Sequence, residues 1–541
     1  MAVTATTAPV PATPPLGRIA RHAPFLAILG SAMLLRVVLA YVAFPGQGFA
    51  ADLNLFAGWA ATLGRVGPGA FYQASGANYP PGYMYVLWLV DVLARPVGAV
   101  FGISSDEAIL WLLKVPPMLA DAAIAVLLYR AGRSWFGGSA GLLAAALYLF
   151  APISWYDSAL WGQVDAVGSL LMLAGLIALA DGWSEPATSF AVASVLVKPQ
   201  DAICLVVILP VLARRHLLRI GSGPRPRLGT RLAALDRRLH GLLTSQGPLR
   251  LVSALAVGAI VGIVLLLPFD IQTLASNDWR SIPVVGHIAG LASLFSSAAG
   301  QFDVLTANAF NAWSLVGQTP LTGVAGSGTG TWTLDSLPVL WGIPAVQLGA
   351  ALLVIVGLTV AGGLLVRDDR LTILLAFAVV AFAFYAVPTR VHERYLFALF
   401  PAGALLVCNY AAGGVGYAVT AVLNAVNVHA VLGNSQLIGG FPGGGGGFGG
   451  RAGGGQGFGG GGGFNGGFGV GPAGPGGSSG ASSISLPFVD LARSEPVVAA
   501  VAIGQTLAFI ALLGVWIAFA FGPLLPRRAT DESAKAADAF A

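Results

Sequence analysis

Repeated apolar runs constrain this chain more than any other feature of its sequence. Several windows carry no charge over the ~20 residues that an α-helix needs to cross the hydrocarbon core of a bilayer. Examples are 251–269, 338–366, 371–389 and 496–521. Only 9% of the residues are charged, whereas about 25% are charged in an average soluble domain. The sequence therefore predicts an all-α, polytopic membrane protein.

A basic loop predicts the orientation of these helices. Nine arginines and one acid, Asp236, lie between Arg214 and Arg250. Loops rich in arginine stay on the cytoplasmic side of the membrane, so we expect this loop to be cytoplasmic. Asp52 and the segments 161–165 and 391–395 then share the outer side, and both termini are cytoplasmic.

Two segments decide the number of crossings. The run 82–103 is apolar but contains Asp91, Arg95 and Pro96, so we interpret it as an interfacial or re-entrant helix at the outer face. The run 187–213 is interpreted as two short crossings, because a turn at Lys198 lifts this cation away from the bilayer centre. About twelve crossings result: 24–44, 108–129, 137–155, 164–181, 187–198, 200–213, 251–269, 338–366, 371–389, 395–413, 415–431 and 496–521.

The domain organisation follows from these crossings. We expect a disordered cytoplasmic N-terminus at 1–23 and one transmembrane unit at 24–431. That unit contains the basic cytoplasmic loop 214–250 and an outer loop at 270–337. The segment 432–495 is a glycine-rich outer insert, which we expect to be disordered because it has too little apolar surface to bury. The final transmembrane helix, 496–521, precedes a cytoplasmic tail at 522–541.

Polar and ionisable residues gather at the predicted outer boundary. For a single residue, a snorkelling anchor or a member of an interfacial aromatic belt is as good an explanation as function. The set favours function, because costly charges within a membrane protein arrive in compact motifs beside aromatic and amide groups. The candidate site residues are Asp52, Tyr79, Tyr83, Lys114, Trp161, Gln163, Asp165, Lys198, Gln200, His392, Glu393 and Arg394.

The mixture of side chains indicates a reaction. Aromatic rings and glutamine amides suit a sugar, whereas Lys198, His392 and Arg394 suit a phosphate leaving group, which needs positive partners in a water-poor site. A carboxylate such as Asp52, the only acid between 52 and 83, suits general-base removal of a proton from an acceptor hydroxyl. Together they predict transfer of a sugar from a lipid phosphate.

The order of these motifs resembles a known group of enzymes. Asp52 after the first helix, Tyr79-Pro80-Pro81, Lys114 with Asp121, Trp161-Gly162-Gln163-Val164-Asp165, Lys198-Pro199-Gln200 and His392-Glu393-Arg394-Tyr395 occur in that order. In this the chain resembles polytopic glycosyltransferases of the GT-C superfamily over about residues 24–431. It is most similar to the bacterial branch related to GPI mannosyltransferases and dolichyl-phosphate-glucose glucosyltransferases.

The resemblance implies specific roles. Asp52 would be the catalytic base of an inverting hexosyl transfer, and the most similar branch suggests mannosyl transfer. His392, Arg394 and Lys198 would hold the donor phosphate, and Trp161, Gln163 and Asp165 would line the sugar or acceptor pocket. The remaining candidates, Tyr79, Tyr83, Lys114, Gln200 and Glu393, are assigned to substrate binding.

The same resemblance implies the partners. They are a polyprenyl-phosphate-linked sugar, a glycan, glycolipid or protein acceptor, and membrane lipid, with no nucleic acid. No cofactor is implied. No metal is expected either, because the first outer loop lacks an Asp-x-Asp pair, although Asp157 and Asp165 leave a site with Asp52 open as an alternative.

Two other functions explain part of the sequence. A transporter or flippase would use the same charges as a substrate path, but it predicts an internal repeat with matching helix interruptions. The chain has one interruption, at Lys198-Pro199, without a counterpart in its second half. An inactive scaffold that binds a partner through the glycine-rich insert leaves the ordered motifs unexplained.

Overall fold

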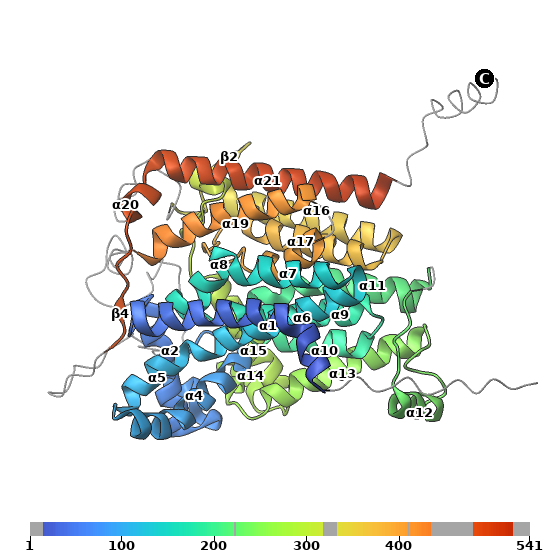
Figure 1. Ribbon diagram of the computed structural model, residues 1–541, viewed down its shortest axis with the longest axis horizontal. Coiled ribbons are helices and arrows are strands. Elements are labelled where there is room, and N and C mark those ends of the chain that lie inside the picture. Colours follow the sequence, from blue (N-terminus) through green and yellow to red (C-terminus); the bar gives the residue numbers. More distant parts are fainter. Residues whose placement is uncertain (1–14, 221–222, 317–332, 409–410, 434–479, 523–541) are drawn as a thin grey trace, which may run out of the picture.

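Helices make up most of the described chain, because within a bilayer a helix satisfies the backbone hydrogen bonds inside its own segment. The computed structural model describes residues 15–220, 223–316, 333–408, 411–433 and 480–522. Long helices run side by side along the bundle in Figure 1, including α1, α7, α19 and α21. The all-α polytopic class is confirmed.

The element bounds are as follows. The α-helices are α1 (Pro15–Val37), α2 (Ala50–Val66), α3 (Phe71–Ser75), α4 (Pro81–Phe101), α5 (Ser105–Leu113), α6 (Val115–Phe136), α7 (Gly138–Phe150), α8 (Pro152–Trp155), α9 (Asp165–Ala180), α10 (Ser184–Val195), α11 (Leu205–Leu212), α12 (Thr230–Arg238), α13 (Pro248–Leu266), α14 (Asn277–Arg280), α15 (Val285–Ala299), α16 (Ala345–Val366), α17 (Arg370–Ala386), α18 (Leu399–Val407), α19 (Ala411–Leu432), α20 (Val489–Ala492) and α21 (Glu495–Phe521). The π-helices are η1 (Val38–Ala43), η3 (Tyr156–Trp161) and η5 (Ala213–Leu218), and the 3₁₀-helices are η2 (Pro68–Ala70), η4 (Pro199–Cys204), η6 (Ile271–Leu274) and η7 (Ala312–Leu315).

Two short sheets complete the described structure. Strand β1 (Gln47–Gly48) pairs in parallel with β4 (Ser482–Ser483), and β2 (Pro338–Leu340) pairs antiparallel with β3 (Ile343–Pro344). The β2–β3 hairpin precedes α16. The crossing expected at 338–366 therefore begins at Ala345, because the chain turns back on itself before the helix starts.

Length and composition identify seven described segments that can cross a membrane, or eight if the pair α7 and 152–161, bent by 54°, counts as one. The predicted number of twelve stays a prediction. Several predicted crossings contain short helices, such as α10, α11 and the nine-residue α18. Helix α4, expected to be interfacial, is itself long and apolar enough to cross, and it packs mainly against α2 and α5.

The break predicted at Lys198-Pro199 is present. Helix α10 ends at Val195, Lys198 has an extended backbone, and Pro199 starts η4. A proline disfavours helical geometry in the residue before it and cannot donate an intrahelical hydrogen bond. The sequence thus places Lys198 at a helix interruption.

The predicted loops fall at opposite ends of the bundle. Figure 1 shows α2, α5, β4 and α20 at one end and α12, from the basic loop, at the other. This separation agrees with their assignment to opposite sides, and the identity of the outer side stays a prediction. In the predicted glycine-rich insert, 434–479 lie outside the described residues, whereas 480–494 contain β4 and α20. The predicted N-terminus and tail lie mostly outside them too, at 1–14 and 523–541.

Candidate active site

Asp52 lies in the first turn of α2, where the helix dipole favours a negative charge. Its Oδ2 accepts hydrogen bonds from Trp161 Nε1 and Gln163 Nε2, both at 2.7 Å. Arg394 Nη1 lies 3.6 Å from the same oxygen. Among the described residues Oδ1 accepts no hydrogen bond, and the side chain is 19% exposed. One oxygen is thus held in place while the other is available.

The two hydrogen-bond donors to Asp52 come from a distorted turn. Trp161 ends the π-helix η3, and Gly162 follows with φ 80°, a left-handed conformation that suits glycine. A side chain at Gly162 would also collide with Leu53, whose Cδ2 would lie 2.6 Å from the added Cβ. Gln163 Oε1 accepts a hydrogen bond from the backbone N–H of Val164 at 2.9 Å. Its amide nitrogen is therefore directed to Asp52.

Arg394 joins three carboxylates. Its Nη1 donates to Glu393 Oε1 at 2.8 Å, and its Nε lies 3.6 Å from Asp165 Oδ2. The guanidinium carbon lies 4.6 Å from the ring centroid of Trp161, which is a cation–π distance. Arg394 thus bridges Asp52 and Asp165, the two acids considered as partners in a metal site.

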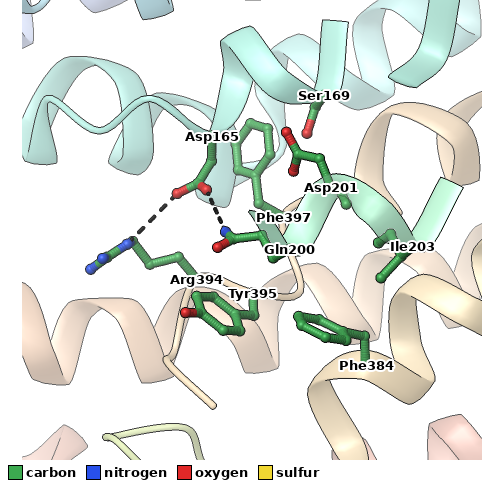
Figure 2. A pocket seen from close by; sticks show the side chains of 10 residues that line it. Asp165, Ser169, Gln200, Asp201, Ile203, Phe384, Arg394, Tyr395 and Phe397 are labelled. Atoms are coloured by element: carbon green, nitrogen blue, oxygen red, sulfur yellow. Dashed lines mark hydrogen bonds and ion pairs between the residues drawn. The ribbon is translucent and has the colours of Figure 1, made fainter. Parts of the chain in front are cut away.

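Asp165, at the start of α9, is the middle of a second group of polar contacts, next to the group around Asp52. Its Oδ1 accepts from Lys198 Nζ at 2.7 Å and from Gln200 Nε2 at 3.3 Å. Lys198 Nζ also lies 5.5 Å from the ring centroid of Tyr79. Figure 2 shows Asp165 between Arg394 and Gln200. The Lys198-Pro199-Gln200 and His392-to-Tyr395 motifs therefore meet at Asp165.

His392 and Glu393 have altered acid–base properties. Burial, followed by the charges of Arg394 and Lys198, lowers the pKa of His392 well below its ordinary value. His392 is therefore neutral, whereas the sequence suggested that it would be a positively charged partner of the donor phosphate. Burial raises the pKa of Glu393 to about 7, although Arg394 opposes this shift.

Two predicted site residues lie away from this cluster. Lys114 Nζ donates to the backbone oxygen of Gln47 at 2.6 Å, so it supports the segment before Asp52. Tyr83 is fully buried behind Tyr79, with its ring edge-to-face on Phe56. Its hydroxyl has no hydrogen-bond partner within the described residues. The other ten predicted residues are joined by the contacts given above and by the proximity of His392 Nδ1 to Glu393 Oε2, at 3.9 Å.

Two buried residues of the site, Asn424 and Asp201, were not named from the sequence, and Asp157 was named only as a possible metal partner of Asp52. The backbone oxygen of Asp157 accepts from the N–H groups of Gly162 and Gln163, both at 3.0 Å. Asn424 Nδ2 donates to the backbone oxygen of Glu393 at 2.9 Å. Asp201 lines a cavity next to Asp165. An amide inside the apolar run of α19 was a usable signal for Asn424, since polar groups in such helices are costly.

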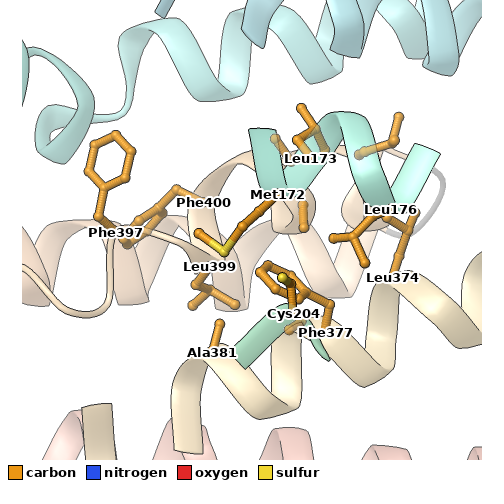
Figure 3. Packing of buried hydrophobic residues seen from close by; sticks show 14 of the residues in the cluster. Met172, Leu173, Leu176, Cys204, Leu374, Phe377, Ala381, Phe397, Leu399 and Phe400 are labelled. Carbon is orange, nitrogen blue, oxygen red and sulfur yellow. The ribbon is translucent and has the colours of Figure 1, made fainter. Parts of the chain in front are cut away.

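An apolar core holds the supports of the site together. In Figure 3, Met172, Leu173 and Leu176 of α9 face residues of α17 and α18, with Cys204 of η4 among them. All these side chains are buried. The core fixes α9, which begins at Asp165, against α18, which follows Arg394 closely in the chain.

Metal ligation has no obvious donor set here. Across the described ranges, no three His, Cys, Asp or Glu side chains are grouped as metal ligands would be. The metal independence of the reaction stays a prediction.

Comparison with known proteins gives matches in structure alone. No protein-family model and no characterised protein matches the sequence. The fold is similar to ArnT from Cupriavidus metallidurans bound to undecaprenyl phosphate, at 15% identity and TM-score 0.39, covering 93% of this chain and 78% of that one. It is also similar to the archaeal oligosaccharyltransferase AglB from Archaeoglobus fulgidus, in complex with an inhibitory peptide and a dolichol-phosphate. That match has 12% identity, TM-score 0.38, and coverage of 92% and 56%.

Both matches concern the fold alone. Identities and TM-scores this low carry no argument about activity. The function is therefore argued from the residues of the site.

Proposed function

We propose that this protein is a membrane glycosyltransferase. It moves a hexose, in the first instance mannose, from a polyprenyl-phosphate donor to a hydroxyl of a glycan, glycolipid or protein acceptor at the outer face. The observation that carries the proposal is the pairing of an accessible carboxylate, Asp52, with a buried guanidinium, Arg394, 3.6 Å away. Sugar transfer from a phosphate needs a base and a phosphate-binding cation within one substrate length of each other.

Asp52 and Arg394 have different parts in the proposed reaction. The acceptor hydroxyl oxygen attacks the anomeric carbon, and its proton passes to Asp52 Oδ1. The bond between the anomeric carbon and the phosphate oxygen breaks, and its electron pair leaves with the polyprenyl phosphate. Because attack and departure occur on opposite faces of the sugar, the anomeric configuration is inverted. Trp161 and Gln163 keep the carboxylate directed at the acceptor.

The leaving phosphate is received by cations that are already buried. Arg394 and Lys198 are held by carboxylates, so their positions are fixed before the donor arrives. Preorganised charge of this kind stabilises a developing anion without reorganisation. Neutral His392 supplies an N–H donor to the same phosphate.

A transporter or flippase for a lipid-linked or small polar substrate is the second candidate. The broken segment at Lys198-Pro199 favours it, because interrupted helices form substrate sites in transporters. Arg394 and Lys198 nevertheless lie together, held by Asp52 and Asp165. This arrangement fits a local reaction better than a path across the membrane.

The deciding experiment measures transfer by the purified full chain in bilayers. Radiolabelled polyprenyl-phosphate-mannose and polyprenyl-phosphate-glucose are the donors, and an extract of the host's lipids and glycans supplies the acceptor. We expect product with wild type and with Asp106→Asn, an exposed acid of α5, and none with Asp52→Asn. Substrate uptake without transfer would instead establish the transporter.

A further inference from the structure

A small cavity lies on the side of Asp165 that faces Asp201 (Figure 2). Its empty volume, including the open mouth, is about 260 Å³. As it stands, the interior accommodates about one water-sized group. The lining residues are Asp165, Ser169, Gln200, Asp201, Ile203, Phe384, Arg394, Tyr395, Phe397 and Ala398.

Two carboxylate oxygens at this cavity lack donors. Asp165 Oδ2 and Asp201 Oδ2 are buried and have no hydrogen-bond partner within the described residues. Asp165 Oδ2 has only Arg394 Nε nearby, at 3.6 Å, and no ion pair to Asp201 occurs in the described part of the chain. Leaving a buried acceptor unsatisfied costs about 1–3 kcal/mol, so a donor from outside the protein would stabilise the site.

The residues that line the cavity indicate which chemical group would supply the hydrogen bond. Gln200 Nε2 and Lys198 Nζ are already directed at Asp165 Oδ1, so the groups without hydrogen-bond partners are the two acceptor oxygens and one donor, Arg394 Nε. An anionic group would be repelled by the two oxygens, and an apolar group would leave them unsatisfied. The Phe384 and Tyr395 rings, stacked at 5.7 Å, form an apolar wall next to them. A single neutral hydroxyl meets all of these conditions.

The side chain of Asp201 occupies space that is free because Gly168, opposite it, has no side chain. A methyl group added to Gly168, one turn into α9, would overlap Asp201 Oδ2. Ser169, the next residue, presents its side chain to the same cavity in Figure 2. The cavity therefore depends on Gly168 and Ser169 of α9 and on the 3₁₀-helix η4, which carries Asp201.

We propose that Asp201, with Asp165 and Ser169, forms a subsite that binds one ring hydroxyl of a neutral hexose donor. The inference rests on the proposed function. Arg394 lies 3.6 Å both from Asp52 Oδ2 and from Asp165 Oδ2. A donor whose phosphate contacts Arg394 therefore has its sugar within reach of the cavity. An acetamido group in place of that hydroxyl is too large to enter.

The test is a panel of polyprenyl-phosphate hexoses, each lacking one hydroxyl. With wild type, we expect one deoxy donor to lose about 10- to 100-fold in kcat/KM, as for a lost hydrogen bond to a charged group. With Asp201→Ala, the intact donor loses a similar factor, and the penalty for that deoxy donor disappears. Gly168→Ala should behave like Asp201→Ala, whereas Gly175→Ala, in the same helix but facing Ala187 and Phe190, keeps the wild-type discrimination.

The alternatives give different results. If Asp201 only orders a structural water, Asp201→Ala lowers kcat/KM by one common factor for every donor, and the subsite is overturned while transfer stands. If wild type transfers no hexose from any donor, the proposed function and the subsite are overturned together. Thermal unfolding of each variant separates misfolding from altered recognition, and Ser169→Ala provides the mildest change at the cavity.

Discussion

Arg394 Nη1 lies 3.6 Å from Asp52 Oδ2, although more than half of the chain separates the two residues. Asp52 comes from the first turn of α2, and Arg394 from the loop between α17 and α18. Trp161 connects them, since its indole N–H donates to Asp52 and its ring faces the guanidinium. The site is thus assembled by the whole bundle.

Replacing Asp52 tests the base. Asp52→Asn keeps the size of the side chain but removes its ability to take a proton, so we expect kcat to fall by about 10²- to 10⁴-fold, the usual contribution of a general base. Donor binding should not weaken, because the cations remain and one opposing negative charge beside Arg394 is removed. The measurement is single-turnover transfer beside equilibrium binding of the donor. Wild-type turnover by this variant would show that another group takes the proton.

Replacing Arg394 tests the phosphate contact. Arg394→Lys keeps the charge but cannot contact Asp52, Asp165 and Glu393 at the same time. We expect a loss of about 10- to 100-fold in kcat/KM, the size of a lost charged hydrogen bond. The control is Arg390→Lys in the same loop, where the native side chain pairs with Asp335. Equal losses in both variants would point to a general effect on the loop.

Glu393 gives the folded protein a pH dependence below neutrality. Burial raises the pKa of its carboxyl group from 4.5 to about 7, so the folded state binds this proton more tightly than the unfolded chain. The resulting stability is fully present below pH 4.5 and is lost as pH rises through about 7. We expect the Tm of wild type to fall across this range relative to that of Glu393→Gln.

The same proton should control donor binding. When Glu393 is ionised, three carboxylates face the two cations Arg394 and Lys198, whereas protonation leaves Asp52 and Asp165 to balance them. A phosphodiester donor, whose own charge is constant near neutrality, should therefore bind more tightly as pH falls through about 7. His392 adds no change, because its pKa is already well below the ordinary value. Calorimetric titration with Glu393→Gln should give affinities that do not vary with pH.

The membrane class and the helix interruption were predictable because they depend on local chemistry. Uncharged apolar runs need internally hydrogen-bonded helices, and Pro199, which cannot donate an intrahelical hydrogen bond, favours a helix end just before it. The residues of the site were also recognisable, since charges in a membrane protein are costly enough to be few. The sequence does not show which of these residues contact one another.

The pairing of charges shows this limit. Lys114 and Asp121 were taken together as one motif of the resemblance, but Asp121 Oδ2 accepts from Arg36 Nε at 2.8 Å, and Lys114 donates to the backbone oxygen of Gln47. Asp201 was passed over although an acid inside the predicted crossing 200–213 was a usable signal; the space that Gly168 leaves for it is seen only in the packing. Interhelix geometry, set by thousands of small contacts, decides such partners.

The orientation is tested by thiol labelling. Gln163 is fully buried, so a reporter is better placed at the exposed Ala74, in α3 of the predicted outer segment, and at the exposed Thr230, in the basic loop. Cys204 and Cys408 are first replaced, so that the introduced cysteine is the only thiol that can be labelled. We then expect Ala74→Cys to react with an impermeant reagent in intact cells. Thr230→Cys should react only after permeabilisation. The reverse pattern would place the site on the cytoplasmic side.

Arg36 and Asp121 form a buried ion pair at 2.8 Å. Both side chains are fully buried, and Asp121 Oδ2 also accepts from Ser158 Oγ at 2.6 Å. Ser158 belongs to η3, which ends at Trp161, a donor to Asp52. The pair therefore positions the turn that orients the catalytic carboxylate.

Arg36→Met leaves an unpaired buried carboxylate, so we expect a loss of about 3–5 kcal/mol in stability. The double variant Arg36→Met/Asp121→Leu replaces both charges by apolar groups and should recover most of that stability. It still lacks the carboxylate that ties Ser158 to another helix, since the remaining acceptor is the nearby backbone oxygen of Ser154, so its kcat should stay low while KM for the donor remains near wild type. Recovery of kcat together with Tm would show that the pair serves stability alone, whereas low kcat in a stable protein means that it holds Trp161 in place for Asp52.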